Sequence, residues 1–102
     1  MVAEIFSGMD ADFQAGVVKK PLSFYFSVGE VKQTVFLTPE SCRVLVGKQT
    51  EAADCVCKMG EELFLRIWQQ GYRPGLKDFL TGAIKSNDPE ALKTFLAAFG
   101  KG

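Results

Sequence analysis

The spacing of apolar residues along the chain changes from a helical period to an alternating one and back again. Large apolar residues recur every three or four positions from Val2 to Phe13, and again from position 61 onward, which is the spacing of amphipathic helices. Between these regions apolar and polar residues alternate, as they do in half-buried strands. A run of strands followed by a run of helices indicates an α+β fold, with helices packed on one face of an antiparallel sheet.

The alternating region contains four predicted strands, at Leu22–Val28, Val31–Thr38, Ser41–Val46 and Ala52–Met59. Gly29-Glu30 suits a two-residue hairpin turn, and Pro39-Glu40 suits the next tight turn. Because three short connections follow one another, we expect an antiparallel, mostly meander sheet of four to five strands. The segment 83–86 is either the fifth strand or a loop. Gln33 is a small misfit, because it falls on the apolar face of its strand.

Three helices are predicted after the strands. The first follows Gly60, begins with two acidic residues that favour a helix N-terminus, and ends at Gly71. A short helix follows Pro74. The last helix has the strongest signals, because Asp88 is a good N-cap and Pro89 suits the first helical position. Its apolar residues recur at i, i+3, i+4 and i+7.

Composition limits the classes of function. The chain has 102 residues, which we take as a single domain over 1–102, and 47% of them are hydrophobic. Twelve basic residues balance twelve acidic ones, so we expect no nucleic-acid partner. The absence of His removes His-dependent triads and histidine metal sites. The sequence therefore predicts no catalytic residues, no cofactor and no enzyme activity.

The three cysteines are an odd number, which favours free thiols in a reducing compartment. Cys55 and Cys57 form a C-x-C pair rather than the C-x-x-C of zinc sites, so we expect small buried hydrophobes and no metal site. No signal peptide is visible, and no apolar run approaches the ~20 residues of a membrane span. The chain ends in Gly-Lys-Gly rather than in a peroxisomal Ser-Lys-Leu signal. We therefore expect a cytoplasmic protein.

The second half of the chain combines these signals in a recognisable order. Its segments are Ala53-Asp54-Cys55-Val56-Cys57-Lys58-Met59, Glu61-Glu62-Leu63-Phe64-Leu65, Gly71, Pro74, Phe79-Leu80-Thr81-Gly82, Ala83-Ile84-Lys85, Asn87-Asp88, and Leu92 through Phe99. This order, over about half of the chain, resembles the sterol carrier protein-2 domain family, in which the chain would be a small stand-alone member. Its specificity comes from core and turn residues, since none of these motifs is catalytic.

The resemblance implies that sheet and helices enclose a hydrophobic tunnel that holds a lipid. The ligand would be a sterol, a fatty acid, an acyl-CoA or another apolar lipid such as a phospholipid, and contact with a membrane would be at most transient. Carried over by position, the ligand-binding residues are Phe64, Trp68, Phe79, Leu80, Ile84, Leu92, Phe95, Leu96 and Phe99. Lipid binding or lipid transfer is the function that follows.

Two alternatives stay open from the residues. The same apolar stripes are what a solid core needs, because sequence cannot distinguish a filled interior from a hollow one. The chain would then be a non-catalytic protein-interaction or dimerisation module, and a homodimer is its simplest form. The segment Tyr72–Gly75 lies between two predicted helices, where it is either a mouth for a ligand or a turn.

Overall fold

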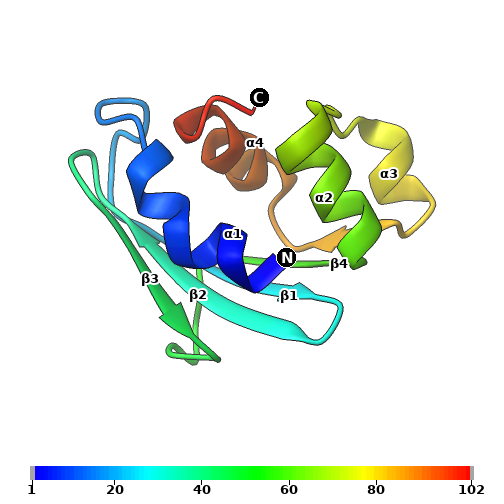
Figure 1. The fold of residues 1–102 in the computed structure, drawn as a ribbon, viewed down its shortest axis with the longest axis horizontal. Helices are drawn as coiled ribbons and strands as arrows, with labels where there is room; N and C mark the ends of the chain where they lie inside the picture. Colours follow the sequence, from blue (N-terminus) through cyan, green and yellow to red (C-terminus); the bar gives the residue numbers. More distant parts are fainter. Residues whose placement is uncertain (1, 102) are drawn as a thin grey trace.

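The computed structural model describes residues 2–101 and arranges them as a five-stranded sheet with its helices over one face (Figure 1). This confirms the α+β class. The elements are α1 (Val2–Gly8), the 3₁₀ helix η1 (Met9–Asp12), β1 (Leu22–Val28), β2 (Val31–Leu37), β3 (Cys42–Val46), β4 (Cys55–Met59), α2 (Glu61–Gln70), α3 (Leu76–Leu80), β5 (Ile84–Ser86) and α4 (Pro89–Ala98). The segment left open as strand or loop is therefore the short strand β5.

The strand order is β3-β2-β1-β4-β5. The first three strands form the expected antiparallel meander, with Phe24 opposite Val35 and Val35 opposite Val44. The expectation that the fourth strand continues the meander is wrong. Strand β4 does not continue the meander beside β3 but pairs in parallel with β1, with Phe24 opposite Cys55. The sheet is therefore mixed, with β1 at its centre and β3 and β5 at its edges.

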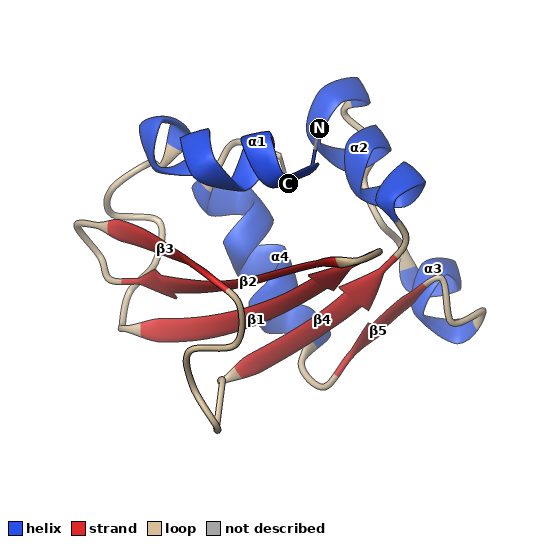
Figure 2. Ribbon diagram, turned by 60° about the horizontal axis from the view of Figure 1, so that its bottom comes forward, coloured by secondary structure: helices blue, strands red, loops and turns tan. Residues whose placement is uncertain are grey.

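A buried threonine shows how the chain reaches the far side of β1. Thr34 is fully buried although its neighbours Gln33 and Val35 take the positions that face the helices. Its hydroxyl donates to the Gly47 carbonyl (2.7 Å) and accepts from the Gln49 amide (2.9 Å). The connection after β3 therefore crosses the outer face of the sheet, where Figure 2 shows it passing in front of the strands.

The start of the parallel pair is fixed by a reciprocal set of hydrogen bonds. The Asp54 carboxylate accepts from the amide (2.9 Å) and the hydroxyl (3.1 Å) of Ser23, and the Ser23 hydroxyl accepts from the Asp54 amide (2.9 Å). These bonds join the residue before β4 to the beginning of β1. They set the register that places Cys55 beside Phe24.

The cysteines of β4 belong to the core. Cys55 and Cys57 are fully buried under the helices, and Cys42 on β3 is half-buried. Burial raises the pKa of Cys57 to about 12 and that of Cys42 to about 11, the latter also through the nearby charge of Asp10. Among residues 2–101 no group of three His, Cys, Asp or Glu residues is placed to hold a metal ion.

We expect Thr34→Val to destabilise the protein by about 1–3 kcal/mol, because valine keeps the shape but leaves the Gly47 carbonyl and the Gln49 amide unpaired. Urea unfolding followed by circular dichroism measures this change. Thr81→Val removes an exposed hydroxyl that donates to the Lys77 carbonyl (2.9 Å), and should cost less than about 0.5 kcal/mol. Equal effects of the two substitutions would contradict the role given to Thr34.

The thiols provide a second prediction. An ordinary cysteine pKa of 9.0 against about 11 for Cys42 means about a hundredfold less thiolate at pH 8 in the folded protein. Iodoacetamide should therefore alkylate Cys42 about a hundred times more slowly in buffer than in urea, as measured by mass spectrometry. Since the unfolded thiols ionise first, unfolding should become easier as pH rises from 9 towards 11. Equal alkylation rates in buffer and urea would refute the assigned burial.

Candidate functional site

The structure gathers most of the predicted ligand-binding residues in the core between sheet and helices. Seven of the nine are buried: Phe64, Trp68, Ile84, Leu92, Phe95, Leu96 and Phe99. Phe79 is partly buried. Leu80 is 76% exposed and lies on the short helix α3. Whether any of the nine touches a ligand stays a prediction.

The buried rings touch one another in a continuous series. Phe95 on α4 lies 5.0 Å and 4.7 Å, centroid to centroid, from Phe24 and Phe26 of β1. It also lies 4.8 Å from Phe99 and 6.3 Å from Trp68. We call the whole set the aromatic cluster: Phe6, Phe13, Phe24, Phe26, Phe64, Trp68, Phe95 and Phe99. In this conformation the rings of the cluster pack directly between the two layers.

A hollow of about 490 Å³ opens on the outer side of α4, and we call it the α4 hollow. Its lining residues are Arg73, Pro74, Glu90, Lys93, Thr94, Leu96, Ala97 and Lys101. The volume lies within the ordinary range of small-molecule sites. Leu96 belongs both to this lining and to the residues that were predicted from the sequence. The hollow adjoins the aromatic cluster through Lys101, which lines it and lies over the ring of Trp68.

Lys101 separates the α4 hollow from the indole ring of Trp68. Its ammonium group donates to the Trp68 carbonyl (3.0 Å) and lies 5.3 Å from the centre of the Trp68 ring. A cation at this distance over an indole face is attracted by the ring quadrupole. The same contact caps one of the last carbonyls of α2, which helix ends leave unpaired. A change in the occupancy of the hollow should therefore affect the environment of Trp68.

The connection between α2 and α3 shapes one rim of the α4 hollow. The Tyr72 hydroxyl donates to both carboxylate oxygens of Asp78 (2.8 and 3.0 Å), and the Gly75 amide donates to the same carboxylate (2.9 Å). The Arg66 guanidinium lies 4.6 Å from the centre of the Tyr72 ring. The hydrogen bond to Asp78 raises the pKa of Tyr72 above its ordinary value of 10. These contacts hold in place the segment that carries Arg73 and Pro74.

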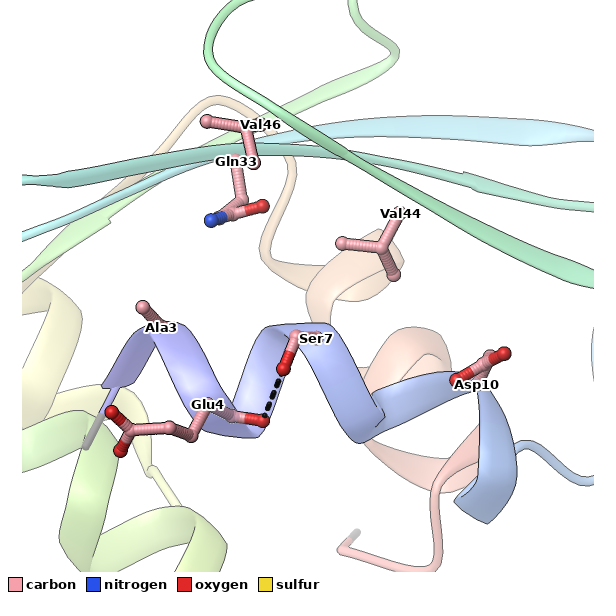
Figure 3. Close-up of a pocket in the computed structure, with 7 residues that line it drawn as sticks. All are labelled: Ala3, Glu4, Ser7, Asp10, Gln33, Val44 and Val46. Carbon is pink, nitrogen blue, oxygen red and sulfur yellow. Dashed lines mark hydrogen bonds between the residues drawn. The ribbon is translucent and has the colours of Figure 1, made fainter.

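A second hollow, of about 480 Å³, lies between α1 and the β2–β3 edge of the sheet, and we call it the α1 hollow. Figure 3 shows the Gln33 side chain projecting from the sheet into it, opposite Ala3 and Ser7 of α1. Asp10 lies at one end, and Val46 on β3 lines it although 76% exposed. Sequence reasoning missed this hollow. The one signal for it was the polar Gln33 on an otherwise apolar face.

The two hollows differ in chemistry. The α1 hollow is lined by Ala3, Val44 and Val46 together with the polar Ser7, Asp10 and Gln33, while the Glu4 carboxylate points away from Gln33 (Figure 3). The α4 hollow is lined by the apolar Leu96 and Ala97 and by more basic than acidic side chains, namely Arg73, Lys93 and Lys101 against Glu90. Of the two, the α4 hollow suits an apolar ligand that has a polar or anionic end. No helix among residues 2–101 is long and apolar enough to cross a membrane.

No protein-family model and no curated protein matches the chain, whereas solved structures do. The inverting sec-alkylsulfatase Pisa1 from Pseudomonas sp. has a TM-score of 0.83 at 14% identity, over 97% of this chain. This chain spans only 16% of the alkylsulfatase chain.

Two smaller proteins match over most of their own lengths. The ubiquinone synthesis protein UbiJ-SCP2 has a TM-score of 0.66 at 15% identity, covering 94% of this chain and 85% of its own. A conserved hypothetical protein from Thermus thermophilus, described as a candidate sterol carrier protein, has a TM-score of 0.52 at 17% identity, covering 89% and 71%. These likenesses confirm the resemblance seen in the sequence at the level of the fold: the chain has the α+β fold of sterol carrier protein-2-like structures.

Proposed function

We propose that the protein binds the hydrocarbon part of a lipid in the α4 hollow, with the aromatic cluster as the wall behind it. The observation that carries this proposal is the hollow itself, of about 490 Å³, whose lining includes the apolar Leu96 and Ala97 and reaches the aromatic cluster at Lys101, over the ring of Trp68. Candidate ligands are fatty acids, acyl-CoAs, sterols and phospholipids. The fold supports the proposal, because one matched protein of this fold is described as a candidate sterol carrier protein.

The packing of the aromatic cluster determines where a ligand fits most easily. Ring centroids only 4.7–6.3 Å apart fill the space between the layers around Phe95. A hydrocarbon chain therefore occupies the outer side of α4 first. The hydrocarbon chain extends inward, towards the aromatic cluster, only if the Lys101 side chain moves away from the face of the Trp68 ring. The seven buried residues predicted from the sequence then act mainly as the wall behind the ligand, and Leu96 is the one that contacts it directly. The exposed Leu80 lies outside this wall.

The charges at the rim favour an anionic head group. The charged side-chain groups of Arg73 and Lys93 line the hollow and have no hydrogen-bond or ion-pair partner within residues 2–101. A carboxylate near them gains Coulomb energy that is screened by salt. The hydrocarbon chain contributes more, because each buried CH₂ is worth about 0.8 kcal/mol. Fatty acids are therefore the most direct probes.

The affinity for fatty acids should rise with chain length if the hydrocarbon is buried. From octanoate to dodecanoate we expect the affinity to increase by up to about fourfold per methylene, the equivalent of about 0.8 kcal/mol. Trp68, the only tryptophan, reports binding through its fluorescence. An affinity that does not depend on chain length would mean that only the head group binds, and would refute the proposal.

A matched pair of substitutions distinguishes the two hollows. Ala97→Gln places a longer polar side chain in the α4 hollow, and Ala3→Gln does the same in the α1 hollow. Both positions are helical and neither is fully buried, so the helices tolerate glutamine. We expect Ala97→Gln to weaken dodecanoate binding at least tenfold and Ala3→Gln to leave it unchanged. The opposite result would place the lipid in the α1 hollow.

A second candidate function is association with another copy of the chain. Strand β3 is an edge of the sheet, and its Val46 is 76% exposed. Exposed edge strands are templates for pairing with another strand. Light scattering at increasing protein concentration tests this candidate: a dimer that dissociates when Val46 is replaced by lysine would support it, and a monomer throughout would exclude it.

A further inference from the structure

The short helix α3 exposes two large apolar side chains to solvent. Leu76 is 74% exposed and Leu80 is 76% exposed, and no residue of α3 is buried. The two leucines are four positions apart and therefore lie on the same side of the helix. Leucine is the residue type that a folded domain would otherwise place in its core, so this pair is the kind of exposed surface that marks an interaction site.

The position of α3 relates it to the α4 hollow. Helix α3 lies at the outer edge of the molecule, next to β5 (Figures 1 and 2). A smaller hollow of about 180 Å³ is lined by Leu76 and Phe79 of α3 and shares Pro74, Glu90 and Lys93 with the α4 hollow. A binding partner that contacts Leu76 and Leu80 therefore lies beside the mouth of the α4 hollow.

The charges around α3, the α4 hollow and the smaller hollow beside it are mainly positive. The cations are Arg73, Lys77, Lys93 and Lys101, and the acids are Asp78 and Glu90. The Asp78 carboxylate is turned towards the connection before α3, where it accepts hydrogen bonds from Tyr72 and Gly75. The chain as a whole has a net charge of zero. This region therefore holds a local excess of positive charge around two exposed leucines.

We propose that α3 docks the protein onto the surface of an anionic lipid bilayer, with Leu76 and Leu80 in the interface and the surrounding cations near the lipid head groups. Apolar side chains beside lysine and arginine are the combination that binds peripheral proteins to such surfaces. A second copy of the chain fits less well, because a two-fold contact through α3 would bring the same cations close together. The docked orientation turns the mouth of the α4 hollow towards the lipid.

The docking surface does not depend on the proposed lipid site, and the two are measured separately. Flotation with vesicles of phosphatidylcholine alone, and of phosphatidylcholine with about one third phosphatidylglycerol, measures docking. We expect binding to the anionic vesicles only. Binding should be lost at about 1 M salt, where the Debye length falls to ~3 Å. Equal binding to both kinds of vesicle, or to neither, would overturn the proposal.

Variants assign the binding to α3. Leu76→Gln with Leu80→Gln should reduce vesicle binding at least tenfold and leave the melting temperature unchanged, because both side chains are exposed. Val46→Thr is the matched control, since Val46 is equally exposed (76%) but lies at the opposite edge of the sheet. It should leave vesicle binding unchanged. A loss caused by Val46→Thr, with none caused by the leucine pair, would refute the role of α3.

The cations are tested in the same way. Lys77→Glu should weaken binding to anionic vesicles several-fold, whereas Lys20→Glu, at a basic position outside this region, should not. The variant with both leucines replaced should still bind dodecanoate in solution with the affinity of the unmodified protein. A failure of docking is therefore distinguishable from a failure of lipid binding. A concentration-dependent dimer that the leucine substitutions dissociate would instead make α3 an interface between copies and would overturn membrane docking.

Discussion

The ring of Phe95 joins the helix layer of the fold to the centre of the sheet. It touches Phe24 and Phe26 from the central strand β1, and Trp68 from α2. Each aromatic pair contributes about 0.5–1.5 kcal/mol beyond the burial of its surface. Because these contacts reach both β1 and α2, α4 cannot shift or rotate without breaking them. The outer side of α4, where the α4 hollow opens, is therefore a wall of fixed position.

The sequence predicted the elements well but not the place of β4. The alternation of apolar residues depends on local geometry, so the strands and the last helix could be located within a few residues. The choice of neighbour depends on which faces the helices cover. If β4 paired with β3, Cys55 and Cys57 would lie beyond Val46, which is itself 76% exposed, and could not be buried under the helices. Beside β1, the two cysteines lie under α4, and this burial favours the crossing that Thr34 holds in place.

The candidate site could be predicted only in part, for a related reason. The apolar stripe of the last helix correctly indicated burial of Leu92, Phe95 and Leu96, but periodicity says nothing about empty volume. The same reasoning from an apolar stripe failed for Leu80, because α3 has only five residues and lies at the edge of the sheet, where its outer side is exposed. The cations that border the α4 hollow fall on polar positions, so no apolar pattern could have indicated them.

A net charge of zero conceals a local excess of positive charge around α3. The β3 edge carries both signs of charge, with Arg43 on β3 and Asp10 at the α1 hollow, while the cations around α3 lie towards the β5 edge. The molecule extends 33 Å along its longest axis, several times the ~8 Å over which charges act at physiological salt. An anionic surface therefore attracts one edge without an equal repulsion from the other. The same local excess orients the protein, because Leu76 and Leu80 place two exposed apolar side chains beside Arg73, Lys77 and Lys93.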